Sequence, residues 1–458
     1  MPEQRKCAIA TARTRLPSKD MVNSRRLLNV GRVLEAAEAA SPVEAVGAVA
    51  RELGLAFGAV SVSFLISDLS GRALVRLAHV PLPGGSLDPG ERRDEDESAT
   101  VLPFDGGPPE QAVRTQSVQV LPPDPAAADD VAGLWGVLAP VTERGESIGL
   151  LELYLPEEPP PDVVAEVAQV AHLLAFVVIA NRRHTDLFEW GQRTRAFSLS
   201  AEIQQRLLPE AQTCEAAAFT LAGWLEPAAR IGGDTFDYSL ARDLLHLSLT
   251  DAMGHGVDAA LTASTCLAGL RGARRRGLTL LEQARATNSA LAEHTPEGRD
   301  DFVTGLVGRL DLTTGRLELV NAGHVSPYLL RGGALTTLEL AIDLPFGLFA
   351  DSDYRSTVVQ LEAGDRLVLI TDGMLERNVA SLDLPGAIRE GTGLHPREVV
   401  RALADSALVA AGHALQDDAT LLCLDWHGRH DVSRNAVSGA EPERASDALP
   451  PTQESRSR

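Results

Sequence analysis

Residues 247–256, LSLTDAMGHG, join an apolar strand pattern to an acidic, glycine-rich turn. Leucines alternate with other residues over positions 245–249, which predicts a strand with one buried face. Asp251 follows this strand, and the glycines after it allow the backbone to turn tightly. An apolar strand over 366–370 runs into Asp372 in the same way. The two segments therefore predict sheets whose strand ends carry carboxylates.

Two further segments contain acidic residues beside predicted strands. Residues 230–237, RIGGDTFD, place Asp234 after two glycines, and Asp417 and Asp418 precede an apolar strand at 420–424. Each motif alone is typical of an ordinary turn, but strand ends that share one rim would bring the carboxylates together. Hard divalent cations such as Mg²⁺ and Mn²⁺ prefer such oxygen ligands. Two ions about 3.5–4 Å apart would activate water at neutral pH and clamp phosphoryl oxygens.

The C-terminal half, from about residue 200 to 426, resembles the PPM serine/threonine phosphatases of the stage II sporulation protein E type, the bacterial relatives of protein phosphatase 2C. The resemblance rests on the four acidic segments and on AEIQQRLLP at 201–209, FVT at 302–304 and NAGH at 321–324. It implies an α-β-β-α sandwich with two Mn²⁺ or Mg²⁺ ions. It also implies in-line attack on phosphorus without a phosphoenzyme.

The resemblance also implies a role for each acidic residue. Asp234, Asp251 and Asp372 are the expected catalytic residues, with Asp251 bridging the two ions. The full expected ligand set is Asp234, Asp251, the Ala252 carbonyl, Asp372, and one of Asp417 and Asp418. Asp417 matches the family pattern best, and Asp418 stays open as the alternative.

Two histidines and a run of arginines are further candidates. His324 follows a predicted strand and would contact substrate, act as an acid or stabilise a turn. His255 lies between Gly254 and Gly256, close to Asp251 in the sequence, where it would orient phosphate. Four arginines cluster near the end of a predicted helix at 259–272, and they favour a helix C-terminus over a phosphopeptide site; they are Arg271, Arg274, Arg275 and Arg276.

Residues 27–180 alternate between helical and strand patterns. A helical pattern over 27–55 precedes strand patterns at 59–67, 74–79, 117–121, 136–141 and 148–155, with a loop at 82–97 and a long helix after Pro159. This order resembles a GAF domain, most closely over residues 139–153. The resemblance implies a sensor that binds a small molecule or dimerises.

The helix after residue 162 carries apolar residues at spacings of four and three, which is the a/d pattern of a coiled coil. The seam residues are Val163, Val167, Val170, Leu174 and Val177. One interpretation is a signalling helix that dimerises the chain and joins sensor to output. The alternative is a helix packed on its own domain. The helical pattern extends to about residue 208, with possible breaks at Gly191 and at 198–200.

Composition excludes several classes of protein. Acidic residues outnumber basic ones by 63 to 42, a net charge of −21, which argues against nucleic acid as a partner. We find no uncharged run of about 18 apolar residues and no secretory signal, so no membrane span is expected. The 4 cysteines lack CxxC spacing, which favours a reducing cytoplasm.

We therefore expect an α/β protein in five parts: a disordered basic arm (1–26), a GAF-like sensor (27–180), a helical linker (181–208), a PPM phosphatase domain (209–427) and a disordered tail (428–458). The expected function is metal-dependent hydrolysis of phosphoserine or phosphothreonine, in a cytoplasmic homodimer under sensor control. The resemblance implies a STAS-type anti-sigma factor antagonist as substrate. The alternative is a ligand-sensing scaffold without catalysis.

Overall fold

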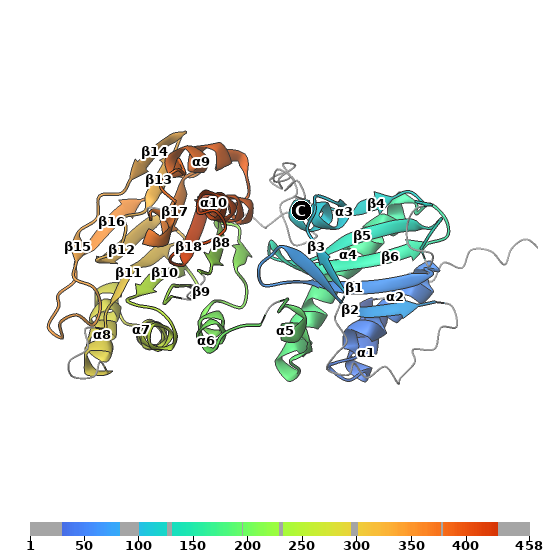
Figure 1. The fold of residues 1–458 in the computed structure, drawn as a ribbon, viewed down its shortest axis with the longest axis horizontal. Helices are drawn as coiled ribbons and strands as arrows, with labels where there is room; N and C mark the ends of the chain where they lie inside the picture. Colours follow the sequence, from blue (N-terminus) through green and yellow to red (C-terminus); the bar gives the residue numbers. More distant parts are fainter. Residues whose placement is uncertain are drawn as a thin grey trace, which may run out of the picture.

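The computed structural model describes residues 30–82, 100–125, 131–194, 196–228, 232–294, 301–376 and 379–428. The expected basic arm, nearly all of the loop at 82–97 and the tail after residue 428 lie outside these residues. The described chain forms two α/β units that lie side by side (Figure 1).

The N-terminal unit is a six-stranded antiparallel sheet with the strand order β3-β2-β1-β6-β5-β4. Its strands are β1 (Ser61–Ser67), β2 (Ala73–Pro81), β3 (Val101–Pro103), β4 (Gln119–Leu121), β5 (Trp135–Glu143) and β6 (Glu146–Leu155). Helices α1 (Val30–Ala39), α2 (Ala45–Phe57) and α4 (Pro161–Asn181) share the larger apolar core on one face. Helix α3 (Pro108–Thr115) packs into a smaller core on the other face.

Alternating hydrophobic residues correctly predicted the strands of this sheet, apart from the three-residue β3. Arg144 and Gly145 form the tight turn that joins β5 to β6, with φ values of 45° and 81°. Helix α3 was missed. Its buried residues include the charged Glu110 and Arg114, so its apolar periodicity is weak.

The a/d seam of α4 faces its own domain. All five seam residues are buried in the core that α4 shares with the sheet and with α2. The interpretation of this seam as a dimer interface is therefore wrong, and the alternative of a packed domain helix is confirmed. The segment Pro161–His184 is also long and apolar enough to cross a membrane, the one such helix among the described residues. The buried face of this helix, which contains the five seam residues, contributes to its apolar composition.

The predicted helical linker is three short helices. They are η2 (Arg182–His184), α5 (Leu187–Gly191) and α6 (Leu199–Leu207), so the chain breaks at both predicted places. Phe188 of α5 is buried in the N-terminal core. Helix α6 instead packs beside α7 (Val257–Arg275) of the C-terminal unit. The two units therefore divide the linker between them.

The C-terminal unit has two stacked sheets. One has the order β15-β12-β11-β10-β9, with β16 paired to β12, and the other has the order β14-β13-β17-β18-β8-β7. Their strands are β7 (Thr213–Glu215), β8 (Phe219–Glu226), β9 (Thr235–Leu240), β10 (Leu244–Ala252), β11 (Val303–Asp311), β12 (Arg316–Ala322), β13 (Tyr328–Arg331), β14 (Ala334–Thr337), β15 (Ile342–Asp343), β16 (Ser356–Gln360), β17 (Arg366–Ile370) and β18 (Ala419–Trp426).

A leucine-rich core fills the space between the two sheets. Helices α7 and α8 (Leu280–His294) cover the first sheet. Helices α9 (Leu384–Glu390) and α10 (Pro396–Ala410) cover the second. The expected α-β-β-α sandwich is confirmed, and Figure 1 shows α10 on the side that faces the N-terminal unit.

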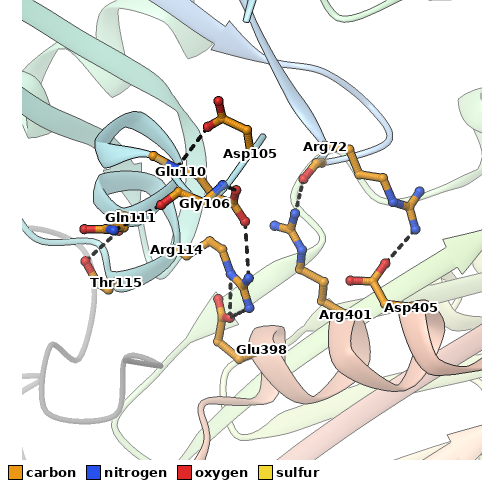
Figure 2. A network of polar contacts seen from close by, with 12 residues as sticks. Arg72, Asp105, Gly106, Glu110, Gln111, Arg114, Thr115, Glu398, Arg401 and Asp405 are labelled. Carbon is orange, nitrogen blue, oxygen red and sulfur yellow. Dashed lines mark hydrogen bonds and ion pairs between the residues drawn. The ribbon is translucent and has the colours of Figure 1, made fainter. Parts of the chain in front are cut away.

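The two units meet through backbone and charged contacts. At the tip of the β5–β6 hairpin, the Arg144 carbonyl accepts a hydrogen bond from the Glu215 amide at 2.9 Å. Glu398 of α10 forms an ion pair with Arg114 of α3 at 3.1 Å, and both side chains are buried. Asp405 of the same helix forms an ion pair with Arg72 at 2.8 Å (Figure 2). Arg401 donates a hydrogen bond to the Gly71 carbonyl. Helix α10 is therefore the main docking element between the units.

Candidate metal centre

The predicted carboxylates gather at one rim of the sandwich. Asp251 is in β10, and Asp234 immediately precedes the neighbouring strand β9. Asp372 follows β17, and the pair Asp417 and Asp418 precedes β18 in the other sheet. The charges of Asp372, Asp417 and Asp418 all act on Asp251. Both sheets thus contribute acidic groups to one site, as the strand-end pattern predicts.

Asp234 is almost fully enclosed, at 2% exposure. Its Oδ2 accepts hydrogen bonds from the Thr371 hydroxyl at 2.7 Å and from the Thr420 hydroxyl at 2.6 Å. Burial raises its pKa well above the ordinary value, and the charges of Asp251 and Asp418 raise it further. Since Thr420 is in β18 and Thr371 directly follows β17, Asp234 ties the two sheets together at the rim.

Asp251 lies at the centre of the negative charge. Burial, followed by the charges of Asp372 and Asp417, raises its pKa to about 7, and a hydrogen bond with Asp234 acts in the opposite direction. Its neighbour Ala252 is buried at the end of β10. The Ala252 amide lies 3.4 Å from the Gly233 carbonyl, and a Cβ on Gly233 would lie 2.8 Å from the Ala252 carbonyl. Glycine is therefore required for this close approach.

The structure separates the roles of the adjacent Asp417 and Asp418. Asp418 is 1% exposed, and its two oxygens accept hydrogen bonds from the Ala228 amide, the Gly232 amide and the Gln204 side chain. Asp417 is half-buried, and its Oδ1 accepts a hydrogen bond from the Asp418 amide at 2.8 Å. Asp417 is therefore the better candidate ligand, and Asp418 holds the neighbouring loop and α6 in place.

Asp372 is the exposed member of the site and begins η3 (Asp372–Met374). A Cβ on Gly373 would lie 2.0 Å from the Asp418 carbonyl, so only glycine permits this turn to approach β18 so closely. The sequence Asp372-Gly373 is thus a structural requirement as well as an acidic motif. It brings the carboxylate of the second sheet to the rim.

Within the described residues, no three carboxylate, imidazole or thiolate groups form a compact ligand cluster. The chemistry of the donors nevertheless fits a hard cation, because the site is built from carboxylate oxygens. Burial and mutual repulsion raise the pKa of Asp234, Asp251, Asp417 and Asp418. A divalent cation would relieve this repulsion.

The two candidate histidines differ. His324 is buried, its Nδ1 lies 2.7 Å from the Thr304 hydroxyl and its Nε2 lies 3.1 Å from the Ile370 carbonyl. Burial lowers its pKa to about 4. Because both ring nitrogens are engaged, the geometry favours the structural alternative, in which His324 joins the two sheets. His255 is exposed, and its charge acts on Asp417, so its predicted role stays open.

Several residues of the site were not predicted. Gln204 of α6 donates to the Asp234 carbonyl at 3.0 Å and to Asp418 Oδ2 at 2.6 Å. Glu376 lies near Asp417 and Asp372, and burial followed by their charges raises its pKa. Thr371 and Thr420 lie close to the acidic motifs in the sequence, but nothing in the sequence predicts their hydrogen bonds to Asp234. The arginine cluster does end α7, and two of its members pair with the buried Asp237.

We expect the metal-free protein to lose stability as the pH rises from about 4 to about 7. The folded pKa values of Asp251 and Asp418, about 7 and about 6, exceed the ordinary value of 3.8. In this window the folded state binds more protons than the unfolded state, so these groups make the free energy of unfolding fall with pH. Urea unfolding in EDTA measures the slope. Asp251→Asn should flatten it, and an identical slope in the variant would contradict the assignment.

Comparison with known proteins relates the C-terminal half of the chain to one family. Residues 241–427 match the family described as stage II sporulation protein E (SpoIIE). The chain is 24% identical over 288 residues to the phosphoserine phosphatase RsbU of Bacillus subtilis (strain 168), which covers 60% of this chain and 83% of RsbU. It is 22% identical over 240 residues to the phosphoserine phosphatase RsbP of the same organism, covering 50% of this chain and 58% of RsbP.

Among solved structures, the RsbU and RsbW domains of Rv1364c from Mycobacterium tuberculosis are 27% identical to this chain. That comparison covers 46% of this chain and 62% of the other, with a TM-score of 0.39. The sandwich, its acidic rim and the sequence match define the C-terminal unit as a PPM-type protein phosphatase domain. Within that class, its residues 241–427 match the stage II sporulation protein E type.

Proposed function

We propose that the protein is a metal-dependent phosphatase that removes phosphate from serine or threonine of a regulatory protein. The observation that carries this proposal is the rim where two sheets gather carboxylates whose pKa values are raised by burial and mutual repulsion. Two Mn²⁺ or Mg²⁺ ions would be held by Asp234, Asp251, the Ala252 carbonyl, Asp372 and Asp417. Such ions activate water and stabilise the charge that develops on the phosphoryl oxygens.

The chain's own residues position this chemistry. Asp418 and Gln204 fix the loop that carries Asp234, and the Thr371 and Thr420 hydroxyls orient the Asp234 carboxylate. His255 is exposed beside Asp417, where a protonated ring would attract a phosphoryl group. The exposed Asp372 leaves the centre open to a phosphorylated side chain of another protein.

The substrate proposal rests on the relatives. RsbU and RsbP are both named phosphoserine phosphatases, which supports a phosphoserine substrate. The resemblance adds a STAS-type anti-sigma factor antagonist as the phosphorylated partner. The N-terminal unit would be a GAF-type sensor that controls this reaction in the cytoplasm. The expected homodimer rested on the apolar seam of α4. Because that seam is buried within the N-terminal unit, no dimer is proposed.

A hydrolysis assay tests the proposal. The full chain with Mn²⁺ should release phosphate from a phosphoserine peptide, and Asp372→Asn should reduce the rate by roughly 10³-fold, because a phosphoryl-transfer centre loses several kcal/mol with one charged contact. Asp351→Asn, at an exposed position away from the rim motifs, is the matched control. A folded chain that binds Mn²⁺ without hydrolysing any phosphoprotein would favour the scaffold alternative.

A fragment separates the phosphatase domain from its control. A fragment that starts at residue 186 would contain Phe188, which belongs to the N-terminal core, and would expose it to solvent. A fragment of residues 197–428 avoids this and retains α6 with Gln204. We expect this fragment to hydrolyse a phosphoserine peptide with Mn²⁺, and to do so at a rate that no longer depends on the sensor. A fragment that folds by circular dichroism but is inactive at every Mn²⁺ concentration would show that the N-terminal unit completes the active site.

A further inference from the structure

A cavity of about 860 Å³ lies between the N-terminal unit and the phosphatase domain. Its walls come from β1 and β6, from the connecting segment with α5 and α6, and from β8 and α10. We call it the interface cavity. Arg114, Glu398 and Arg401, which Figure 2 shows at the junction of α3 and α10, are among its lining residues. Its volume is within the range of small-molecule sites, about 300–1,000 Å³.

Several residues that line the interface cavity have buried polar atoms without a hydrogen-bond partner. Among the described residues, nine buried side-chain nitrogen or oxygen atoms have no hydrogen bond, and four of these nine belong to residues that line this cavity. They are Ser67 Oγ, Ser147 Oγ, Arg397 Nε and Arg397 Nη1. Buried polar groups in folded proteins are nearly always hydrogen-bonded, so a concentration of unmet groups in one cavity indicates a missing partner.

The positions of these atoms are compatible with one ligand. Ser67 ends β1 and Ser147 follows the first residue of β6, and the two strands are neighbours in the sheet, with Ile66 opposite Gly149. Arg397 reaches the cavity from α10 of the other unit. Its Nη2 donates to the Arg114 carbonyl at 3.1 Å, whereas its Nε is 3.5 Å from the nearest Glu398 oxygen. Arg397 Nε is therefore held by charge alone and Nη1 has no hydrogen bond, so these N–H groups are the donors that a ligand would engage.

The chemistry of the donors selects an anion. A guanidinium offers only N–H donors, and a serine hydroxyl donates readily to an anionic oxygen. The Glu398 carboxylate is already paired with Arg114. Burial and the nearby charge of Arg114 lower the pKa of both Arg397 and Arg401, and neighbouring carboxylates partly offset this. Glu398, Glu215 and Glu146 act on Arg397 by charge but accept no hydrogen bond from its Nε or Nη1. An oxyanion would accept from these donors and from the two serine hydroxyls, whereas a cation or an apolar molecule would not.

We propose that the interface cavity binds a small anionic metabolite through a phosphate or carboxylate group, with Arg397, Ser67 and Ser147 as its direct contacts. The site lies between the units and outside the acidic rim. It also borders the segment Arg206–Pro209 at the end of α6, close in sequence to Gln204, which holds Asp234 and Asp418. A bound anion would therefore join the two units beside the helix that supports the metal centre.

Calorimetric titration of the full chain, freed of metal with EDTA, tests this site independently of catalysis. Inorganic phosphate and acetate are the two probes, and they distinguish a phosphate-bearing from a carboxylate-bearing ligand. We expect at least one to bind, the double variant Ser67→Ala/Ser147→Ala to weaken binding by about tenfold or more, and Arg397→Gln to abolish it. Arg389→Gln, at an exposed position on α9, is the control and should bind like the wild type.

The serine variants also carry a second readout. Since neither hydroxyl has a partner, their removal should leave the unfolding temperature of the anion-free chain unchanged or slightly higher. This variant decides the question even if Arg397→Gln fails to fold. Binding of neither probe to the wild type, or equal affinity in the wild type and the serine variant, would overturn the proposal.

Discussion

Asp251→Asn is expected to reduce Mn²⁺-dependent hydrolysis by roughly 10³-fold or more while raising the unfolding temperature of the metal-free chain. Activity falls because an amide is a poorer ligand for a hard cation than a carboxylate. Stability rises because Asp251 repels Asp372 and Asp417, and this repulsion contributes to the rise of its pKa to about 7. An amide at position 251 carries no charge, and it can donate permanently to the Asp234 carboxylate.

Three measurements on the same samples test this prediction. Circular dichroism should show the native fold, thermal unfolding in EDTA should show a gain of about 2–4 °C per kcal/mol of relieved repulsion, and added Mn²⁺ should stabilise the variant less than the wild type. Asp351→Asn controls for the loss of one negative charge elsewhere on the surface. Near-normal turnover by Asp251→Asn would remove this residue from the metal centre. A lower unfolding temperature in EDTA would contradict the account of its charge.

The acidic rim was largely predictable because its signal is local. A strand that ends in Asp251 or Asp372 places a carboxylate at a sheet edge, and the sequence pattern reveals both the strand and its end. The supporting contacts were not predictable in this way. Gln204 reaches Asp418 across 214 positions in the chain, and nothing in the helix that contains it indicates that partner.

Adjacent or repeating residues set a second limit on prediction. Asp417 and Asp418 are equivalent in composition, but successive residues near a strand point in different directions. One became a buried acceptor of three donors and the other a half-buried group at the rim. His324 shows the same limit, since its buried contacts join Thr304 of β11 to Ile370 of β17, and these two strands lie in different sheets.

Helix α4 shows a third limit, because its spacing of apolar residues is the same whether the partner is another chain or the helix's own sheet. Heptad spacing specifies one apolar face and does not specify what covers it. In this protein, strand β5 and helix α2 cover that face. The distinction has a large consequence for the effect of mutations on the seam.

Val170→Glu should therefore unfold the N-terminal unit instead of dissociating a dimer. Val170 is 4% exposed within the core of that unit, and a carboxylate there would have no described cationic partner. Burying an unpaired charge costs several kcal/mol, which corresponds to a fall in unfolding temperature on the order of 10 °C for a domain of this size. Gln169→Glu adds the same charge at the adjacent exposed position and should leave stability nearly unchanged.

Thermal unfolding and limited proteolysis measure the outcome in the full chain. For Val170→Glu we expect early loss of the N-terminal unit and a protected C-terminal fragment, because the sandwich has cores of its own. Phe176→Glu adds a further comparison, since Phe176 is 47% exposed on the same helix and is not part of the core. If Val170→Glu folds as well as Gln169→Glu and sediments as a smaller species than the wild type, the seam joins two chains, and the packing of α4 against β5 is not the state that exists in solution.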